Sequence, residues 1–222
     1  MTLTSYAWKQ WLPICVGSAI PVSITVYLAQ TYVWLWIVAG AIATATLAVL
    51  SFYRNPWRSI PKNLPDGTML SPADGVVSAI EYVDSHEAVG GKAVIIRIFL
   101  SVLNVHINRA PIDCTVQKLI YREGKFLDAR TEESAKINES NLIILESNER
   151  PFGLRQVSGK LAKRIICPLS EGQTLNQGQQ FGMITLGSTT ELILPMDAEP
   201  SLLVKKTQRV RGGITPLAQV QL

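Results

Sequence analysis

The sequence predicts a mainly β domain, a compact β-sandwich or barrel-sandwich, preceded by an N-terminal transmembrane helical hairpin. The first 53 residues contain no Asp or Glu and only one charged residue, Lys9. From residue 67 onward, short runs of Val, Ile and Leu recur about every ten residues between turn signals, as in β-sandwiches and barrels. The chain has 222 residues, enough for one such domain and an additional segment.

Two apolar runs, residues 11–29 and 33–52, form the predicted hairpin. Each holds about 19 or 20 residues, and a helix of that length crosses roughly 30 Å of hydrocarbon. A cleaved signal peptide is the alternative for the first run, but the run is long for one and a second follows at once. A hairpin that dips into one leaflet of the membrane also stays open.

The charges around the two runs predict the orientation of the hairpin. Lys9 precedes the first run, Arg54, Arg58 and Lys62 follow the second, and the link between the runs carries no charge. Because positive residues stay on the cytoplasmic side, both ends are expected there. The sequence therefore predicts a protein of the cell membrane with its β domain on the cytoplasmic face.

Residues 54–66 are predicted to be a linker because Pro56, Pro61 and Pro65 exclude a regular helix. The β domain is then residues 67–222. The polar stretch 131–138 is predicted to be a solvated loop. Strands are expected at residues 75–82, 92–99, 113–121, 141–146, 154–166, 183–186, 191–194, 201–205 and 216–222.

Composition limits the partners and cofactors. The formal net charge is +4, which favours an anionic partner such as a lipid surface, and no nucleic-acid motif is present, so no nucleic-acid partner is predicted. The three cysteines have no metal-binding spacing and indicate a reducing compartment without disulfides. The two histidines exclude a multi-histidine metal site, and no metal is expected.

A polar notch, residues 187–190, interrupts two apolar arms near the C-terminus. The simple interpretation is a turn between two strands. The alternative is chemical: Gly187 has no Cβ, so its carbonyl is open to approach, and the hydroxyl of Ser188 follows directly. Thr189 and Thr190 add nearby amides and hydroxyls. These are the groups that a self-cleaving chain needs.

Residues 186–189, Leu-Gly-Ser-Thr, resemble the self-cleavage motif of phosphatidylserine decarboxylases. Three further segments match the family in its order: 71–75, 104–111 and 156–159. The resemblance covers about residues 54–222 and is to the short form of the family. It implies autocatalytic cleavage between Gly187 and Ser188, with Ser188 becoming a covalent pyruvoyl cofactor. That group would form a Schiff base with phosphatidylserine and release CO2 and phosphatidylethanolamine. The two chains are expected to stay associated, and a homodimer is compatible with this scheme.

The resemblance also implies roles for side chains that have simpler interpretations. Asp74 fits an Asp-Gly turn, and His106 fits a structural histidine, but the family motifs make His106 the base and Asp74 the group that orients it. Arg109 stands where many long-form members have a second histidine. Either His106 serves both cleavage and decarboxylation, or Arg109 binds the substrate's carboxylate or phosphate; a structural ion pair stays open. Thr189 is also expected at the substrate.

The alternative functions are decarboxylation of a related lipid, a binding or adaptor role, and serine hydrolysis. A related serine phospholipid with ether chains, of the archaetidylserine type, presents the same head group. From another class, a membrane-anchored lipoyl-like binding or adaptor module shares the glycine-rich strand pattern, although a carrier needs a lysine where this chain has residues 187–190. A serine hydrolase would usually show a Gly-x-Ser-x-Gly elbow, which is absent here. Two bands on a denaturing gel would favour the decarboxylase.

Overall fold

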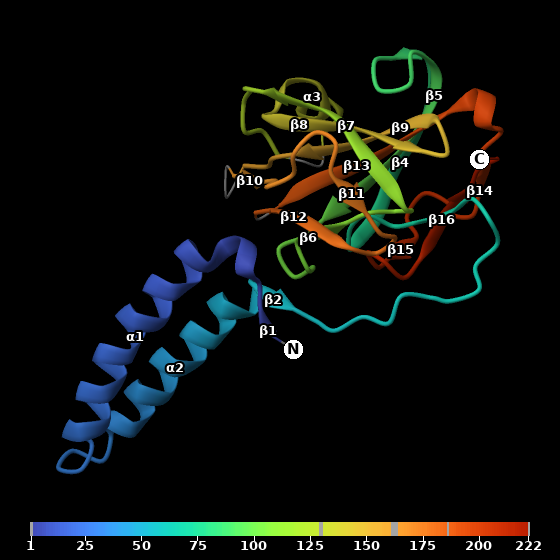
Figure 1. The fold of residues 1–222 in the computed structure, drawn as a ribbon. Coiled ribbons are helices and arrows are strands. Elements are labelled where there is room, and N and C mark those ends of the chain that lie inside the picture. The colour runs from blue at the N-terminus through green and yellow to red at the C-terminus, as the bar shows by residue number, and fades with distance from the viewer. Residues whose placement is uncertain (1, 129–130, 161–163, 186, 222) are drawn as a thin grey trace. The chain divides into compact units, whose positions relative to one another are not determined.

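The computed structural model describes residues 2–128, 131–160, 164–185 and 187–221, and the chain divides into two compact units between Trp57 and Arg58. The first unit is helical and the second is mainly β (Figure 1). The predicted fold class, a mainly β domain after apolar N-terminal helices, is confirmed.

The first unit is a helical hairpin. Helices α1 (Trp8–Leu28) and α2 (Leu35–Ser51) pack against each other, and a short 3-10 turn, η1 (Ser5–Ala7), precedes α1. At the open end of the hairpin, β1 (Thr2–Leu3) pairs with β2 (Arg54–Asn55). Residues 5–28 are long and apolar enough to cross a membrane, whereas α2 has 17 residues and is shorter.

The predicted linker is partly ordered at both ends. Residues 54–55 form β2 and so belong to the helical unit, because their backbone is paired with the first strand of the chain. Arg58 belongs to the second unit, where it binds a carboxylate. The prolines do exclude helix: no helix is assigned between α2 and residue 131 in the described part of the chain.

The second unit contains three antiparallel sheets. The largest is a curled, half-barrel sheet of eight strands in the order β11-β7-β8-β9-β13-β5-β4-β15. Two smaller sheets have the orders β10-β12-β6 and β14-β16-β3. The strands are β3 (Thr68–Leu70), β4 (Gly75–His86), β5 (Gly91–Leu100), β6 (Ile107–Arg109), β7 (Cys114–Arg122), β8 (Ser140–Ser147), β9 (Arg150–Val157), β10 (Ile165–Ile166), β11 (Thr174–Leu175), β12 (Gln180–Ile184), β13 (Ser188–Pro195), β14 (Ser201–Leu202), β15 (Arg209–Val210) and β16 (Pro216–Gln219).

The main core lies on one face of the eight-stranded sheet. Alternate residues of its central strands point into this core, as the period of two in a strand requires. They include Ile96 and Ile98 of β5, Leu154 of β9, and Leu192 and Leu194 of β13, all fully buried. A smaller apolar cluster on the opposite face contains Ala88, Ala93, Ile95, Leu142 and Ile193. Strand β13 is therefore covered on both faces.

Two sequence predictions are corrected by the sheet topology. The single strand expected at 154–166 is two strands, because the chain leaves the large sheet after Val157 and β10 pairs with β12 in another sheet. The solvated loop expected at 131–138 contains a short helix, α3 (Glu132–Ile137), which begins where the Ser134 amide donates to Thr131 Oγ1 at 3.2 Å. Helix η2 (Met196–Ala198) follows β13.

Candidate active site

Strand β13 begins at the proposed cleavage junction. Ser188 is its first residue and pairs with Leu100 of β5, and Thr189 pairs with both Phe99 of β5 and Val157 of β9. The predicted turn over residues 187–190 is therefore wrong for three of the four, which lie in a central strand. Leu186, the first residue of the motif, lies outside the described residues.

Gly187 adopts a backbone conformation that favours glycine. Its φ is +69°, in the left-handed region, and among the described residues other than its chain neighbours no atom lies within 4 Å of the position that a Cβ would take. The chain can bend sharply there because glycine adopts this region without a steric penalty. The conformation of Gly187 thus sets the direction in which the chain enters β13 at Ser188.

Three chain segments meet at this point and form what we call the junction edge, residues 104–106, 164–166 and the described residues of 183–190. The Ile184 amide donates to the His106 carbonyl at 3.2 Å, which joins the first and third segments. The Thr185 amide donates to the Arg164 carbonyl at 3.1 Å, which joins the second and third. Gly182 permits the close approach, since a Cβ there would lie 2.4 Å from the Ile166 carbonyl oxygen.

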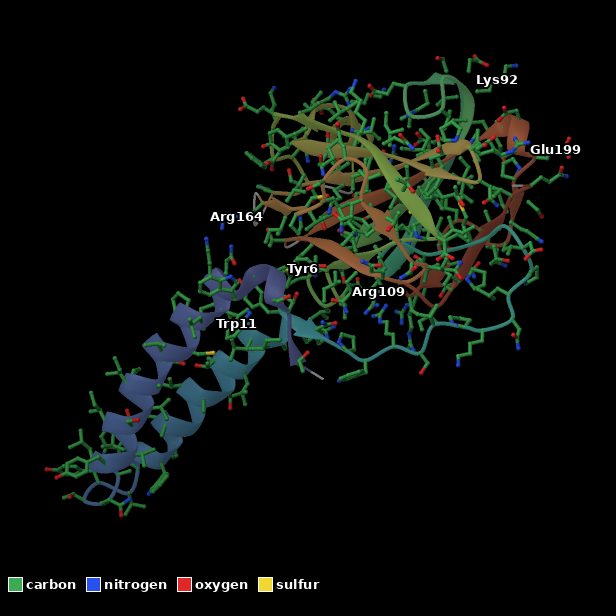
Figure 2. All side chains as sticks on the ribbon, viewed as in Figure 1. Tyr6, Trp11, Lys92, Arg109, Arg164 and Glu199 are labelled. Atoms are coloured by element: carbon green, nitrogen blue, oxygen red, sulfur yellow. The ribbon has the colours of Figure 1, made fainter. Side chains whose placement is uncertain are left out.

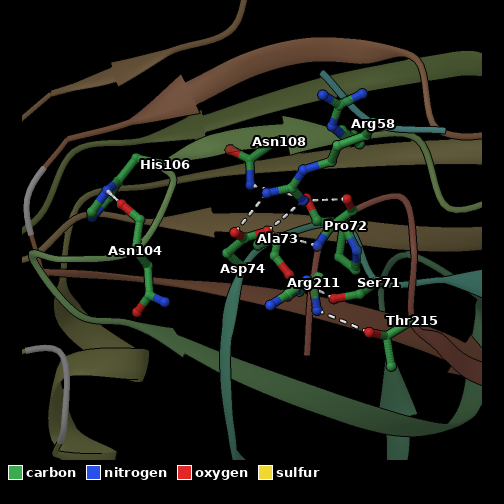
Figure 3. A network of polar contacts seen from close by, with 12 residues as sticks. Arg58, Ser71, Pro72, Ala73, Asp74, Asn104, His106, Asn108, Arg211 and Thr215 are labelled. Atoms are coloured by element: carbon green, nitrogen blue, oxygen red, sulfur yellow. Dashed lines mark hydrogen bonds and ion pairs between the residues drawn. The ribbon is translucent and has the colours of Figure 1, made fainter. Parts of the chain in front are cut away.

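His106 is fully buried at the junction edge. Its Nδ1 lies 2.9 Å from the Asn104 carbonyl oxygen (Figure 3). A carbonyl only accepts hydrogen bonds, so this contact assigns the ring proton to Nδ1 and makes Nε2 the basic nitrogen. The backbone of Asn104 thus gives His106 the orientation and tautomer of a general base.

Ser188 is also fully buried, and in the described part of the chain its Oγ has no hydrogen-bond partner. Leaving a buried hydroxyl without a partner costs about 1–3 kcal/mol, so such atoms are rare in folded proteins. The side chain lies on the same face of β13 as Thr190, because the two residues are two apart in one strand. Burial without a partner suits a hydroxyl that is kept for reaction.

Asp74 is held by a different partner from the one that the resemblance implies. Its two carboxylate oxygens accept hydrogen bonds from Arg58 at 2.6 and 2.7 Å, and Oδ1 also accepts from the Gly212 amide at 2.8 Å. In Figure 3 the carboxylate faces Arg58, and the imidazole of His106 lies apart from it. The structure therefore does not bring Asp74 to His106, and the contact that orients the ring comes from Asn104.

The ion pair between Arg58 and Asp74 leads to a first prediction. The two side chains are 9% and 13% exposed, so each charge depends on the other for its solvation. Removing one partner of a buried pair costs about 3–5 kcal/mol. We expect Asp74→Asn to lower the unfolding midpoint, measured in an uncleaved Ser188→Ala background, while Asp197→Asn on the exposed helix η2 leaves it unchanged.

The opposite outcome would restore the role that the resemblance implies. If Asp74→Asn retains its unfolding midpoint but, with Ser188 present, stays uncleaved, the carboxylate acts in the chemistry rather than in the fold.

Arg109 and Thr189, the two residues expected at the substrate, are both buried. Arg109 is buried in β6, and its Nη1 donates to the Gly178 carbonyl at 2.8 Å. Thr189 is buried on the face of β13 opposite to Ser188, as strand alternation requires. Binding of substrate by either residue stays a prediction.

A row of buried, hydrogen-bonded side chains next to Ser188 was not predicted from the sequence. Asn141 Nδ2 donates to Gln156 Oε1 at 3.1 Å, and Gln156 Nε2 donates to Asn108 Oδ1 at 2.9 Å. Asn108 Nδ2 then donates to Thr190 Oγ1 at 3.0 Å. Four strands contribute one residue each, so these hydrogen bonds hold β6, β8 and β9 against β13. The only sequence signal was the presence of Asn108 and Gln156 in segments that match the family motifs.

The other face of β13 is fixed by charge. Glu191 is fully buried, and its carboxylate contacts Arg97 of β5 at 2.7 Å and Arg155 of β9 at 3.3 Å. Arg97 also pairs with Glu81 of β4 at 2.7 Å. Ion pairs to both neighbouring strands hold β13 in register three residues after Ser188. The position of Ser188 is therefore determined from both sides of the sheet.

A hollow of about 1090 Å³ in the second unit is not the site of these residues. Its lining includes Asn63, Asp113, Asn176 and Glu199 but none of Ser188, His106 or Asp74. The buried serine and histidine that the sequence predicts to be reactive lie at the junction edge instead.

Comparisons with known proteins identify the family. The sequence model described as phosphatidylserine decarboxylase matches residues 45–218. The phosphatidylserine decarboxylase proenzyme of Carboxydothermus hydrogenoformans is 42% identical over 79% of this chain and 81% of its own length. The proenzyme of the same name from Rhodopirellula baltica is 38% identical over 97% of this chain and 92% of its own length. That from Desulfotalea psychrophila is 40% identical over 79% of this chain and 81% of its own length.

The family model and the related proenzymes make this chain a decarboxylase of the proenzyme class. It belongs to the phosphatidylserine decarboxylase family. Family membership sets aside the adaptor and serine hydrolase alternatives.

Proposed function

We propose that the protein decarboxylates phosphatidylserine to phosphatidylethanolamine and CO2 with a pyruvoyl group made from Ser188 by autocatalytic cleavage. The observation that carries the proposal is the junction itself: a buried serine hydroxyl without a partner in the described structure follows a glycine with a left-handed backbone. The names of the related proenzymes support the substrate and the processing.

The residues of the junction edge suit the cleavage. His106 Nε2 takes the proton from Ser188 Oγ, and Oγ attacks the Gly187 carbonyl carbon. The peptide C–N bond breaks as the ester forms, and the proton goes to the Ser188 nitrogen. Loss of the Ser188 α-proton then breaks the ester and releases residues 1–187 with a carboxylate. Hydrolysis of the remaining unit consumes one water and releases one ammonia.

The surroundings of Ser188 fit a pyruvoyl group. A ketone has no hydrogen to donate, so a buried position whose Oγ donates to no described acceptor suits it. When present, the group supplies an electron sink for the carbanion left by the loss of CO2, the role that other decarboxylases give to a bound cofactor. The protein's own part is to hold residue 188 at the end of β13 and to keep His106 Nε2 available for proton transfer.

The two products are proposed to stay associated. Residues 188–222 contain β13, which lies between β5 and β9, and β15 and β16, which pair with β4 and β3. Every one of those partner strands lies in residues 1–187. Separation of the chains would dismantle two sheets, so the cut leaves the fold in place.

The helical unit is proposed to keep the enzyme at the cytoplasmic face of the cell membrane. It contains an apolar helix long enough to span a bilayer, and Lys9 and Arg54 lie at its charged end. The diacyl substrate is confined to the bilayer, so an anchored enzyme meets it without leaving the surface.

The composition of the mature protein tests this proposal. We expect an intact-mass spectrum to show two chains, residues 1–187 and 188–222, and the short chain to resist Edman sequencing because a pyruvoyl group has no amine. The two masses should sum to the precursor mass plus one water minus one ammonia. Active protein with a single chain and an intact Ser188 would overturn the proposal. A sum that exceeds the precursor by a whole water would indicate simple hydrolysis and overturn the pyruvoyl assignment.

The substrate is tested with the same preparation. Release of CO2 from phosphatidylserine, compared with an archaetidylserine-type ether lipid, identifies the preferred backbone. The proposal requires phosphatidylserine to be the better substrate.

A further inference from the structure

We infer that the turn between β5 and β6 is a membrane-docking element, which inserts Val102 and Leu103 into an anionic bilayer and so presents the junction edge to the lipid. The inference rests on the proposed function, because it concerns how that site reaches a substrate in a membrane. We call Val102 and Leu103 the apolar tip.

The apolar tip is exposed although the fold holds it in place. Leu103 is 82% exposed and Val102 is 44% exposed. The turn beneath them is closed by Asn104, whose Oδ1 accepts from the Ser101 amide at 2.9 Å and from Ser101 Oγ at 2.7 Å. The Asn104 amide donates back to the Ser101 carbonyl at 2.9 Å. Two apolar side chains are therefore presented to solvent by a tight, hydrogen-bonded turn.

The position of the tip connects it to the proposed chemistry. Leu100, two residues before Val102, pairs with Ser188, and His106 follows Leu103 by three residues. The carbonyl that contacts His106 Nδ1 belongs to Asn104, the residue that closes the turn. A surface that contacts the tip is thus adjacent to the residues at the cleavage junction. A single exposed leucine is common on proteins, but this one lies beside the proposed active site.

The charge around the tip identifies the surface that it fits. The described residues of the junction edge, the apolar tip and the stretches beside them, within 101–106, 158–167 and 183–190, include no Asp or Glu, and their charges are basic. Lys160 and Arg164 are exposed, and Arg164 lies at the junction edge, where its carbonyl accepts hydrogen bonds from the Thr185 amide and hydroxyl. Exposed apolar residues flanked by basic ones are typical of proteins that bind anionic lipid surfaces. A second copy of the chain would bring the same basic residues together, which disfavours a homodimer through this edge.

The first test is a fluorescence measurement on the full chain in vesicles of phosphatidylcholine and phosphatidylglycerol. A nitrobenzoxadiazole probe is attached at Leu103→Cys, and the matched control is Lys92→Cys. Lys92 lies near the start of β5, about 25 Å along the strand from Leu100, and Figure 2 shows it on the opposite side of the domain from Arg164. The parent protein gives the background labelling; burial raises the pKa of Cys114 to about 12, so that thiol reacts slowly.

We expect lipids with a shallow spin label to quench the probe at position 103 and not the probe at position 92. Equal quenching at both positions, or none at position 103, would overturn the inference. So would a position-103 signal that changes with protein concentration in lipid-free detergent, because that would show a contact between copies.

The second test separates docking from chemistry. The double variant Val102→Ser with Leu103→Ser is compared with Leu203→Ser, which removes an exposed leucine from a segment that carries no proposed site residue. Full burial of a leucine changes an equilibrium by about tenfold or more. We expect the double variant to lose about tenfold in turnover of long-chain phosphatidylserine in vesicles and to retain turnover of soluble dihexanoyl phosphatidylserine, with Leu203→Ser unaffected on both.

An equal loss of turnover on both substrates would show that the turn acts on the catalytic residues. No loss of turnover on either would show that the apolar tip has no part in docking. Each result overturns the inference. If the parent protein decarboxylates neither lipid, the proposed function fails, whatever the fluorescence result at position 103.

Discussion

Ser188→Ala is expected to remain a single chain of 222 residues and to have no decarboxylase activity. The substitution removes the hydroxyl that directly follows Gly187 and leaves the strand intact, since alanine fits the space of a buried serine whose Oγ makes no hydrogen bond in the described structure. Denaturing gel electrophoresis measures processing, and CO2 release measures turnover. Both should fall below detection, because neither the nucleophile of cleavage nor the source of the pyruvoyl group is present.

A second buried serine provides the control. Ser147 ends β8, at the opposite end of that strand from Ser140, which pairs with Val157. Ser147→Ala should be processed and active. Cleavage of Ser188→Ala at the normal position would mean that another group attacks the Gly187 carbonyl, and activity in an uncut Ser188→Ala protein would exclude a cofactor derived from residue 188.

His106→Ala is expected to accumulate uncut precursor. The loss of a general base typically slows a reaction about 10²- to 10⁴-fold, which turns rapid self-cleavage into a slow process that a time course can follow. The structure supports His106 as this base because its Nδ1 contacts the Asn104 carbonyl and Nε2 is left as the basic nitrogen. The rate constant of cleavage after synthesis in a cell-free system measures the effect.

The second histidine of the chain is the matched control. His86 ends β4, and its Nδ1 accepts from the Ala88 amide at 3.1 Å, in a turn remote in sequence from every proposed site residue. His86→Ala should be cleaved at the parental rate. Normal cleavage of His106→Ala would leave Ser188 without an identified base. If Arg109→Ala failed instead, the roles assigned to the two residues would have to be exchanged.

Much of the fold followed from patterns that are local in the sequence. Uninterrupted apolar runs marked the helices, and Val- and Ile-rich runs between turn signals marked β4, β5, β7 and β8 within a few residues. The place of the cleavage junction stays a prediction, and its conformation was predicted wrongly, because a run of Gly, Ser and Thr normally forms a turn. Thr190 is tolerated inside the sheet because the Asn108 amide satisfies its hydroxyl, a contact between residues 82 positions apart.

The contacts of the site itself could not be predicted, since they join residues that are distant in sequence. The Asp74 carboxylate is taken by Arg58, from the predicted linker, and by the Gly212 amide near the C-terminus. His106 is oriented by a backbone carbonyl two residues away, and main-chain contacts leave no trace in residue identity. Residue types therefore predicted candidate reactive side chains, and only the three-dimensional arrangement showed which of them are paired.

The central position of β13 has a consequence for the lifetime of the enzyme. The uncut precursor unfolds and refolds as one molecule, so its folding equilibrium is independent of concentration. Under the proposed cut, unfolding would release residues 188–222 as a separate peptide, and refolding would need a second-order encounter with a partner that lacks a strand at the middle of its largest sheet. Each mature molecule would then have folded only once, as the precursor. Its lifetime would depend on the rate of unfolding rather than on a folding equilibrium.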